Sequence, residues 1–347
     1  MSLNFRRYIH TLILSIILLS LPHLASAQDS EIEELLSLDL EDLIVSVASK
    51  RDEKIAEAPG VINVLTAKEI ELSGARTVFQ ALERLPGVFN IISSTTPERT
   101  LSIRGNGSDL GDTHVLILLN GRPIREGYSG ALNSQFWRNM PLNAVERIEV
   151  IRGPGSALYG SNAFAGVVNV VTKKVEEGIQ TETSFLYGSD NTKQGEFSVG
   201  QKNEHGGFFA AIKADGTNGR PANGNNIFGQ PIDDRFEQNN LGATLQLQHD
   251  GLSFNFLQTS STERVNNIPA LATSFQQVES SQTFIDIGYT HDFSDDWTGS
   301  VNASLTRTSI DLAPTADFQT NDLYFESNIN GDPVSYTHLT LPTIYSV

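Results

Sequence analysis

The chain has 347 residues, no cysteine and a formal net charge of −17. The lack of cysteine excludes disulfides, zinc–thiolate sites and thiol redox chemistry. The acidic balance argues against a nucleic-acid partner, because the chain would repel its phosphates.

The first 27 residues have the pattern of a secretory signal peptide. Arg6 and Arg7 form a basic start, an apolar run follows from Leu12 to Leu21, and Ala25-Ser26-Ala27 offers small residues for cleavage. The alternative is a membrane anchor, but the apolar run is shorter than the ~20 residues that a spanning helix needs. No other stretch approaches that length. Any passage through a membrane would therefore use strands, which lipid tolerates only in a closed barrel.

Two regions of different pattern follow before the middle of the chain. Residues 28–58 are acidic and polar and contain a short amphipathic piece, so we expect an extended or loosely helical arm. Residues 59–175 alternate short apolar runs with helical segments, which predicts a compact α+β domain. Its expected helices are Ala67–Ser73 and Thr77–Leu85, the latter capped by Thr77, and its expected strands are Val61–Thr66, Leu101–Arg104, Val115–Asn120, Val145–Ile151 and Gly166–Thr172.

From Ile179 onward, apolar and polar residues alternate with period two, which predicts strands with one apolar face. We count eight strands, at 179–187, 194–201, 207–215, 238–248, 252–259, 281–291, 296–308 and 321–329. Short connections at Lys202–Gly206, Asp250-Gly251 and Asp292–Asp295 alternate with long polar loops at 216–237, 260–280 and 309–320. This asymmetry is typical of an outer-membrane barrel, although a soluble sandwich would give the same strand pattern.

The barrel region is expected to be incomplete. Plugged outer-membrane barrels have about 22 strands, many more than residues 176–333 supply. Residues 334–347 contain no Asp, Glu, Lys or Arg, unlike the sequence before them. We interpret this segment as a non-native tail, and the alternative is one more natural strand.

Several motifs in the middle of the chain point to one family. The stretch from Pro141 to Lys174 places a glycine-rich loop between two strand-forming runs. It closely resembles the C-terminal part of the plug domain of TonB-dependent outer-membrane receptors. Further elements similar to the family's occur in the same order, namely Ala58–Thr66, Leu82–Val88, Leu101–Gly105 and Val115–Pro123. The resemblance spans about residues 38–330 and implies a plug domain at 59–175, followed by the N-terminal part of a transmembrane antiparallel β-barrel at 176–333.

The resemblance assigns roles to two arginines. In the family, the arginines of the I-R-G elements, which match Arg104 and Arg152 here, pair with glutamates of the barrel wall. A guanidinium can hold a carboxylate through two parallel hydrogen bonds, which would latch the plug in place. The alternative for each arginine is a solvent-facing position at a loop edge.

The arm contains a segment that resembles a TonB box, Asp42-Leu43-Ile44-Val45-Ser46-Val47-Ala48. Such a segment binds by adding a strand to the edge of TonB, so its main chain supplies the bonds and its sequence is loosely constrained. Leu43 stands where a hydroxyl residue is usual. The alternative is a first plug strand or a linker.

Two polar loops would face an extracellular ligand under the same resemblance. One runs from Ser93 to Glu98 and the other from Arg125 to Gln135. The residues expected to face the ligand are Ser93, Ser94, Thr95, Thr96, Arg125, Tyr128 and Asn133.

The glycines and histidines do not indicate an enzyme. Leu158 and Leu110 stand where G-x-G-x-x-G would need its third glycine, and no G-K-[ST] follows. The seven histidines are scattered without metal-ligand spacing, so no metal or cofactor is expected. A positive φ or close backbone packing explains the loop glycines better than a nucleotide-binding loop does. These glycines are Gly105, Gly121, Gly153, Gly155, Gly160 and Gly166.

The family resemblance implies a transporter in the cell outer membrane. It would bind a scarce chelate, such as a ferric siderophore, haem or cobalamin, and would import it with energy from TonB and its inner-membrane complex. Its other partner would be outer-membrane lipid. The alternative is an exported, non-transporting binding module or adhesin, which depletion of TonB would distinguish.

Overall fold

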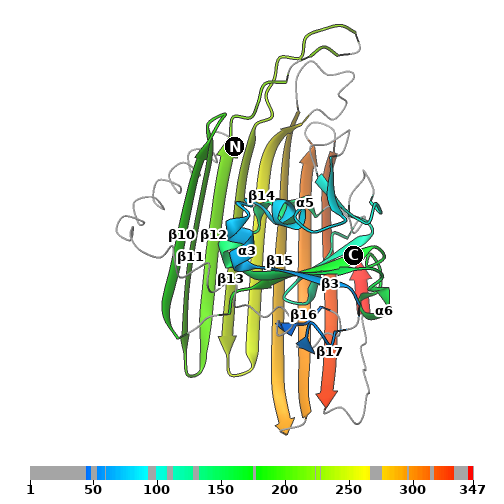
Figure 1. The fold of residues 1–347 in the computed structure, drawn as a ribbon, viewed down its shortest axis with the longest axis vertical. Coiled ribbons are helices and arrows are strands. Elements are labelled where there is room, and N and C mark those ends of the chain that lie inside the picture. Colours follow the sequence, from blue (N-terminus) through cyan, green and yellow to red (C-terminus); the bar gives the residue numbers. More distant parts are fainter. Residues whose placement is uncertain are drawn as a thin grey trace.

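The structure is a computed structural model of the chain. It describes residues 44–47, 53–58, 60–92, 99–107, 112–127, 133–174, 177–222, 224–226, 228–265, 276–294, 297–312, 316–331 and 343–346. Figure 1 shows two parts: a compact domain of small sheets and short helices (residues 60–174), and a tall antiparallel sheet, the strand wall, against which this domain lies. The predicted signal peptide and most of the predicted arm lie outside the described residues.

A five-stranded sheet in the order β3-β8-β9-β6-β7 forms the centre of the compact domain. Its pairs are antiparallel except for β6 and β9, which are parallel. β6 and β9 are buried along their whole length because they lie inside the sheet and both faces are covered. The strands are β3 (Ile62–Thr66), β6 (Val115–Leu119), β7 (Arg122–Ile124), β8 (Val145–Arg152) and β9 (Gly166–Thr172), and a separate hairpin pairs β4 (Val88–Ile92) with β5 (Arg99–Ile103).

The first two helices begin at the residues that the sequence predicts. α3 (Ala67–Leu72) has a capping box, in which Thr66 Oγ1 accepts from the amide of Glu69 and the Glu69 carboxylate accepts from the amide of Thr66 at 2.8 Å. α4 (Val78–Leu82) is capped by the predicted Thr77, whose Oγ1 accepts from the amide of Gln80 at 3.2 Å. α4 ends before the expected Leu85, because the chain turns ahead of Pro86. Three further short helices were not predicted: α5 (Ser134–Asn139), the 3-10 helix η2 (Leu142–Ala144) and α6 (Ser156–Tyr159).

The five-stranded sheet separates two apolar layers. The larger layer lies under α4 and α5 and reaches the strand wall. The smaller layer lies on the opposite face and includes Val47 of the arm and Tyr159 of α6. Residues of β6, β8 and β9 alternate between the two layers, with Ile117, Val150 and Val168 in the larger one and Leu116, Leu118, Ile151 and Val167 in the smaller one.

The strand wall consists of β10 to β17, each paired with the next strand in the chain (Figure 1). The strands are β10 (Gly178–Gly188), β11 (Thr192–Asn203), β12 (Gly206–Thr217), β13 (Gln238–His249), β14 (Leu252–Val265), β15 (Gln276–Ser294), β16 (Trp297–Leu312) and β17 (Ala316–Gly331). The predicted eight-strand antiparallel sheet is therefore confirmed, and among the described strands it does not close on itself.

The wall has the inverse polarity of a soluble sheet. Its covered face carries polar and charged residues, among them Glu196, Lys213, Glu263, Asp286 and Glu326. Its other face exposes large apolar side chains, among them Ile179, Phe185, Tyr187, Leu247, Ile287, Tyr289, Val301, Leu323 and Phe325. An apolar outer face with a polar interior is the pattern of an outer-membrane barrel and not of a soluble sandwich.

The predicted loop at 309–320 is wrong, and the one at 260–280 is too long. β16 continues to Leu312 and β17 begins at Ala316, while β14 extends to Val265 and β15 begins at Gln276. In the extensions of β14 and β15 the sequence is mostly polar at both alternating sets of positions, whereas in those of β16 and β17 the apolar residues, such as Ile310 and Phe318, fall on the other set. In both cases the outward apolar set ends before the hydrogen-bonded pairing does. The long connection between β12 and β13 is present, and it includes isolated bridges such as Pro221 with Arg235.

The last described element lies in the segment interpreted as a non-native tail. β18 (Thr343–Ser346) pairs with β17 at the edge of the sheet. The origin of this segment stays a prediction. No helix in the described part of the chain is both long and apolar enough to cross a membrane.

Candidate functional site

A tight turn brings one arginine of the compact domain to the strand wall. Asn120 and Gly121, between β6 and β7, have φ values of 50° and 77°, which is the conformation that Asn-Gly favours in a two-residue hairpin turn. Arg122 follows, and its Nη1 donates to the carboxylate of Glu326, while its Nη2 donates to Asn302 Oδ1 at 2.6 Å. Arg122 Nε also lies 3.9 Å from Asp286 Oδ1. One guanidinium therefore meets two carboxylates, from β15 and β17.

Side chains of the wall itself hold one of these carboxylates in place, independently of Arg122. Asp286 is 1% exposed and accepts from Ser304 Oγ at 2.7 Å, Asn302 Nδ2 at 3.3 Å and Asn255 Nδ2 at 3.2 Å. A buried carboxylate is costly unless it is hydrogen-bonded and paired with a cation. The wall thus presents an oriented anion at the position that Arg122 occupies.

A second charged contact lies where α5 meets the wall. Arg138 Nη1 donates to Glu263 Oε2 at 2.8 Å, and both side chains are nearly buried. Lys213 of β12 donates from Nζ to the backbone oxygens of Arg76 at 2.6 Å and Arg138 at 3.1 Å, and lies 3.9 Å from Glu196 Oε1. A cation of the compact domain thus binds the wall, and a cation of the wall binds the compact domain.

Neutral polar contacts complete this interface. Asn139 Nδ2 donates to Ser260 O at 3.2 Å and to Ser261 Oγ at 3.0 Å, and the amide of Gly127 donates to Thr320 Oγ1 at 3.2 Å. The end of α5 also approaches β13 closely, since a Cβ at Gly242 would lie 1.8 Å from the carbonyl oxygen of Asn139. Only glycine permits this approach.

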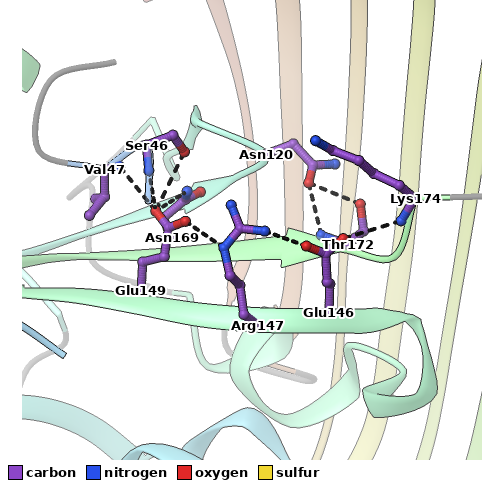
Figure 2. Close-up of polar contacts among 9 residues, drawn as sticks. All are labelled: Ser46, Val47, Asn120, Glu146, Arg147, Glu149, Asn169, Thr172 and Lys174. Carbon is purple, nitrogen blue, oxygen red and sulfur yellow. Dashed lines mark hydrogen bonds and ion pairs between the residues drawn. The ribbon is translucent and has the colours of Figure 1, made fainter. Parts of the chain in front are cut away.

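The arm segment 44–47 docks on the opposite face of the compact domain's sheet (Figure 2). β1 (Ile44–Val45) pairs with β2 (Glu53–Lys54), and Val45 and Val47 are buried. The carboxylate of Glu149 accepts from the amides of Ser46 at 3.2 Å and Val47 at 3.0 Å. The segment is therefore held by strand pairing at Ile44 and Val45 and by a carboxylate at the amides of Ser46 and Val47.

A tyrosine of α6 binds the arm segment from its other side. Tyr159 Oη donates to the carbonyl oxygen of Val47 at 2.9 Å. Burial, followed by the charges of Glu326 and Glu149, raises the pKa of this hydroxyl above its ordinary value, so it stays a donor. Arg125 donates from Nη2 to the carbonyl oxygen of Tyr159 at 2.8 Å; burial lowers the pKa of this guanidinium, and Tyr324 and Asp322 oppose that effect.

Arg104 and Arg152 make hydrogen bonds within the compact domain. Arg104 is exposed, has a φ of 55°, and donates its backbone amide to Gly87 O at 2.7 Å. Arg152 Nη1 donates to Pro86 O at 2.8 Å. Their role as a latch stays a prediction, whereas Arg122 and Arg138, which sequence reasoning did not single out, contact glutamates of the wall.

The residues expected to face a ligand are only partly described. Ser93, Ser94, Thr95, Thr96 and Tyr128 lie outside the described residues, as do Asp42, Leu43 and Ala48 of the TonB-box candidate. Arg125 binds Tyr159 and Ser161. Asn133 is 1% exposed at the start of α5, with its Oδ1 3.5 Å from Gln282 Nε2, and so lies at the wall.

The six loop glycines each have one of the two expected features. A positive φ occurs at Gly105, Gly121, Gly153 and Gly160. A Cβ would lie 2.5 Å from Val167 Cγ2 at Gly155, and 2.5 Å from Ile151 O at Gly166. Within the described residues, no group of three acidic or imidazole side chains is placed to hold a metal ion.

Sequence reasoning also missed Glu149 and Asn169, which are fully buried in the middle of β8 and β9. The sequence could have indicated that both are buried, because each stands among Ile or Val residues of a predicted strand. A polar side chain buried in an apolar strand requires partners. The sequence does not say which partners these are.

Comparison with known families identifies the compact domain. Residues 54–167 match the family model of the TonB-dependent Receptor Plug Domain. The match runs from β2 to the start of β9 and so covers nearly all of the compact domain.

Curated relatives extend the similarity into the wall. The vitamin B12 transporter BtuB of Photobacterium profundum is 34% identical over 203 residues, which are 58% of this chain and 32% of that protein. An iron-regulated outer membrane virulence protein of Vibrio cholerae is 38% identical over 142 residues, which are 40% of this chain and 21% of that protein. The chain therefore spans a third or less of the length of these relatives.

Solved structures share most of this fold. The pyoverdine outer membrane receptor FpvA of Pseudomonas aeruginosa superimposes with a TM-score of 0.62 at 13% identity, over 87% of this chain and 48% of that one. The ferric yersiniabactin uptake receptor FyuA of Yersinia pestis gives 0.59 at 15% identity, over 80% and 46%. At these identities the likeness concerns the fold alone, a plug against part of a barrel.

Proposed function

We propose that this chain, whose residues 54–167 are a TonB-dependent receptor plug domain, is part of an outer-membrane receptor that imports a scarce chelate with TonB-coupled energy. The observation that carries the proposal is the seating of this domain on the polar face of a strand wall whose other face is apolar. A soluble binding module would have no use for an apolar outer face, which water would penalise. Lipid would stabilise it.

The chemical class of the ligand is cobalamin or a ferric chelate. Relatives at 34% and 38% identity carry the names of a vitamin B12 transporter and an iron-regulated outer membrane protein. Haem belongs to the same class of scarce, iron-bearing cargo. The residues proposed to face the ligand are Ser93, Ser94, Thr95, Thr96, Arg125 and Tyr128. Asn133 is left out of this set because it is 1% exposed and lies at the wall.

The proposed partner on the periplasmic side is TonB, which would bind residues 42–48. Ile44 and Val45 are already paired as a strand in the structure, so this part of the segment has the extended backbone that pairing with another strand requires. Force on this segment would be passed to β8 and β9, on which it docks. Arg104 and Arg152 would add latches to the barrel wall beyond those of Arg122 and Arg138.

Uptake assays test the proposal. A receptor in which this chain is followed by enough further strands to close the barrel would be expressed in a strain that lacks its own cobalamin and siderophore receptors. Uptake of radiolabelled cyanocobalamin and of ferric catecholates would be measured with and without TonB. We expect uptake of one of them that is lost without TonB and lost on deletion of residues 42–48. Ligand binding without TonB-dependent uptake would instead indicate a non-transporting binding module.

A further inference from the structure

A continuous series of contacts joins the strand wall to the arm segment 44–47 through the compact domain, and Figure 2 shows its part nearest the arm. At the wall, Arg122 binds Glu326. The preceding residue, Gly121, donates its amide to Asn169 Oδ1 at 2.9 Å. Asn169 Nδ2 donates to Glu149 Oε2 at 3.1 Å, and Glu149 binds the arm segment.

Glu149 is built as a receptor for the main chain of the arm segment. Its Oε2 accepts from the amides of Ser46 and Val47, and Ser46 Oγ lies at 3.4 Å. Its Oε1 accepts from Arg147 Nε at 2.8 Å. The side chain is 0% exposed, and hydrogen bonds to an ionised acceptor are about twice as strong as neutral ones. The contact is therefore strong and depends on the charge.

Asn169 has a bridging position that few residue types could fill. It faces Glu149 directly across the β8–β9 pair and is itself 0% exposed. Its amide oxygen accepts from Gly121 while its NH₂ group donates to Glu149, so each end fixes the orientation of the other. A shift of the β6–β7 turn would remove one end of this bridge.

We propose that Glu149 is a positioning residue that clamps the arm segment, and that Asn169 and the β6–β7 turn couple this clamp to the Arg122–Glu326 contact at the wall. Loss of the wall contact then loosens the arm without any direct contact between them. The arm segment has two states, docked and undocked, and both the Glu149 clamp and the wall contact shift the balance between them. That TonB is the recipient of the released segment rests on the proposed function; the clamp and its coupling do not.

Thiol accessibility tests the proposal, because the full chain has no cysteine and each introduced one is unique. Val45→Cys, the arm reporter, places a thiol in the docked segment at a side chain that is 0% exposed, outside the bonds to Glu149. Val78→Cys, the core reporter, is made in a separate chain at another side chain that is 0% exposed, in the core of the compact domain. The labelling rate of each with a charged maleimide is measured in the full chain in detergent micelles.

Two substitutions should release the arm reporter in different ways. Glu149→Gln should raise its labelling rate by about tenfold or more, because the charged acceptor is lost. Glu326→Gln, in the wall, removes no bond to the arm segment and should raise the rate by about threefold or more through Arg122. The same comparison in a Tyr159→Phe background removes the influence of the Glu326 charge on the hydroxyl that binds Val47, and the increase should remain. In the Glu149→Gln background, Glu326→Gln should add nothing further, since the coupled contact is already lost.

Matched controls separate coupling from general loosening. Glu83→Gln changes an exposed carboxylate of the compact domain at the end of α4, which covers the face of the sheet opposite the arm segment. Glu263→Gln weakens another contact with the wall, that of Arg138, which is not part of the series that leads to the arm. Both should leave labelling of the arm reporter unchanged. The core reporter should stay protected in every variant.

The proposed clamp is refuted if Glu149→Gln does not change the labelling rate of the arm reporter while the core reporter shows that the domain is still folded. The coupling is overturned if Glu326→Gln has no effect, or if Glu263→Gln has the same effect. Because labelling needs neither TonB nor a ligand, a failure here is distinct from a failure of the uptake assay.

Discussion

Substitution of Lys213 should measure how much its buried charge contributes to holding the compact domain on the wall. Its side chain is 1% exposed, and its ammonium donates to two backbone oxygens of the compact domain and lies 3.9 Å from Glu196. Lys213→Met keeps most of the volume of the aliphatic stem and removes the charge and the three donors. It therefore leaves Glu196 as a buried carboxylate without its cation.

The magnitude follows from the buried partner left behind. Removing one member of a buried ion pair costs about 3–5 kcal/mol, which includes the penalty of the stranded charge. The separation of 3.9 Å, and the hydrogen bond that Glu196 keeps from the amide of Asn143 at 3.1 Å, place the expected loss toward the lower end of that range. Glu196→Gln removes the stranded charge, so the double variant should recover about 2 kcal/mol relative to Lys213→Met alone.

Tryptophan fluorescence can measure this loss. The chain has 2 tryptophans, and Trp137 lies on α5 beside the contact, fully buried. In a Trp297→Phe background, its emission reports on the seating of α5 during denaturant unfolding in micelles. Lys202→Met, an exposed lysine of β11, is the matched control and should change the unfolding free energy by less than about 0.5 kcal/mol. If Glu196→Gln made the Lys213→Met variant no more stable, the charge argument would be refuted.

Three further predictions concern packing, capping and pH. Gly242→Ala should destabilise the seated state by about 1–3 kcal/mol, because its Cβ would overlap the carbonyl oxygen of Asn139, and Trp137 fluorescence should show α5 displaced; an unchanged spectrum would contradict the close approach. Thr77→Ala should cost about 1 kcal/mol in thermal unfolding, whereas Thr77→Ser should cost little because it keeps the hydroxyl that caps α4. Since the pKa of Tyr159 is raised on folding, the stability that its neutral hydroxyl provides is complete below the ordinary tyrosine pKa of about 10 and is lost above it. Between about pH 9 and about pH 11, the unfolding free energy should thus fall more steeply for the wild type than for Tyr159→Phe, and equal slopes would refute the assignment.

The strands were predictable because their physical signal is local. β9 has four Val residues around Asn169, between a glycine and a threonine, and it was expected with the bounds that it has. The wall strands alternate apolar and polar residues wherever one face meets the apolar exterior. Where the strands continue beyond that band, as at the end of β16, the outward set of positions becomes polar, with Arg307, Ser309 and Asp311. The apolar outward pattern that indicated the strand therefore ends before the strand pairing does.

The interface was not predictable because its partners are far apart in the chain. Arg122 and Glu326 are separated by 204 positions, and Arg138 and Glu263 by 125. In the sequence, Arg122 is one residue of an Asn-Gly turn, and nothing local distinguishes it from a solvent-facing arginine. Glu149 and Asn169 are different, because their place inside apolar strands indicates a buried polar pair even when the partners are unknown.

The arm segment cannot be docked on the compact domain and paired with a partner strand at the same time. Docking therefore controls whether a partner can bind this segment. The amides of Ser46 and Val47 donate to Glu149, and Ile44 and Val45 pair with β2, so these groups are occupied before any partner strand arrives. A partner that needs the same groups binds only the undocked fraction, and its apparent affinity falls in proportion to that fraction. If the arm is docked about 99% of the time, the affinity falls about 100-fold, and a change that weakens docking about tenfold restores nearly tenfold of that loss. A wall contact that biases docking by even this modest amount would therefore suffice to control access to the arm, without a large rearrangement of the compact domain.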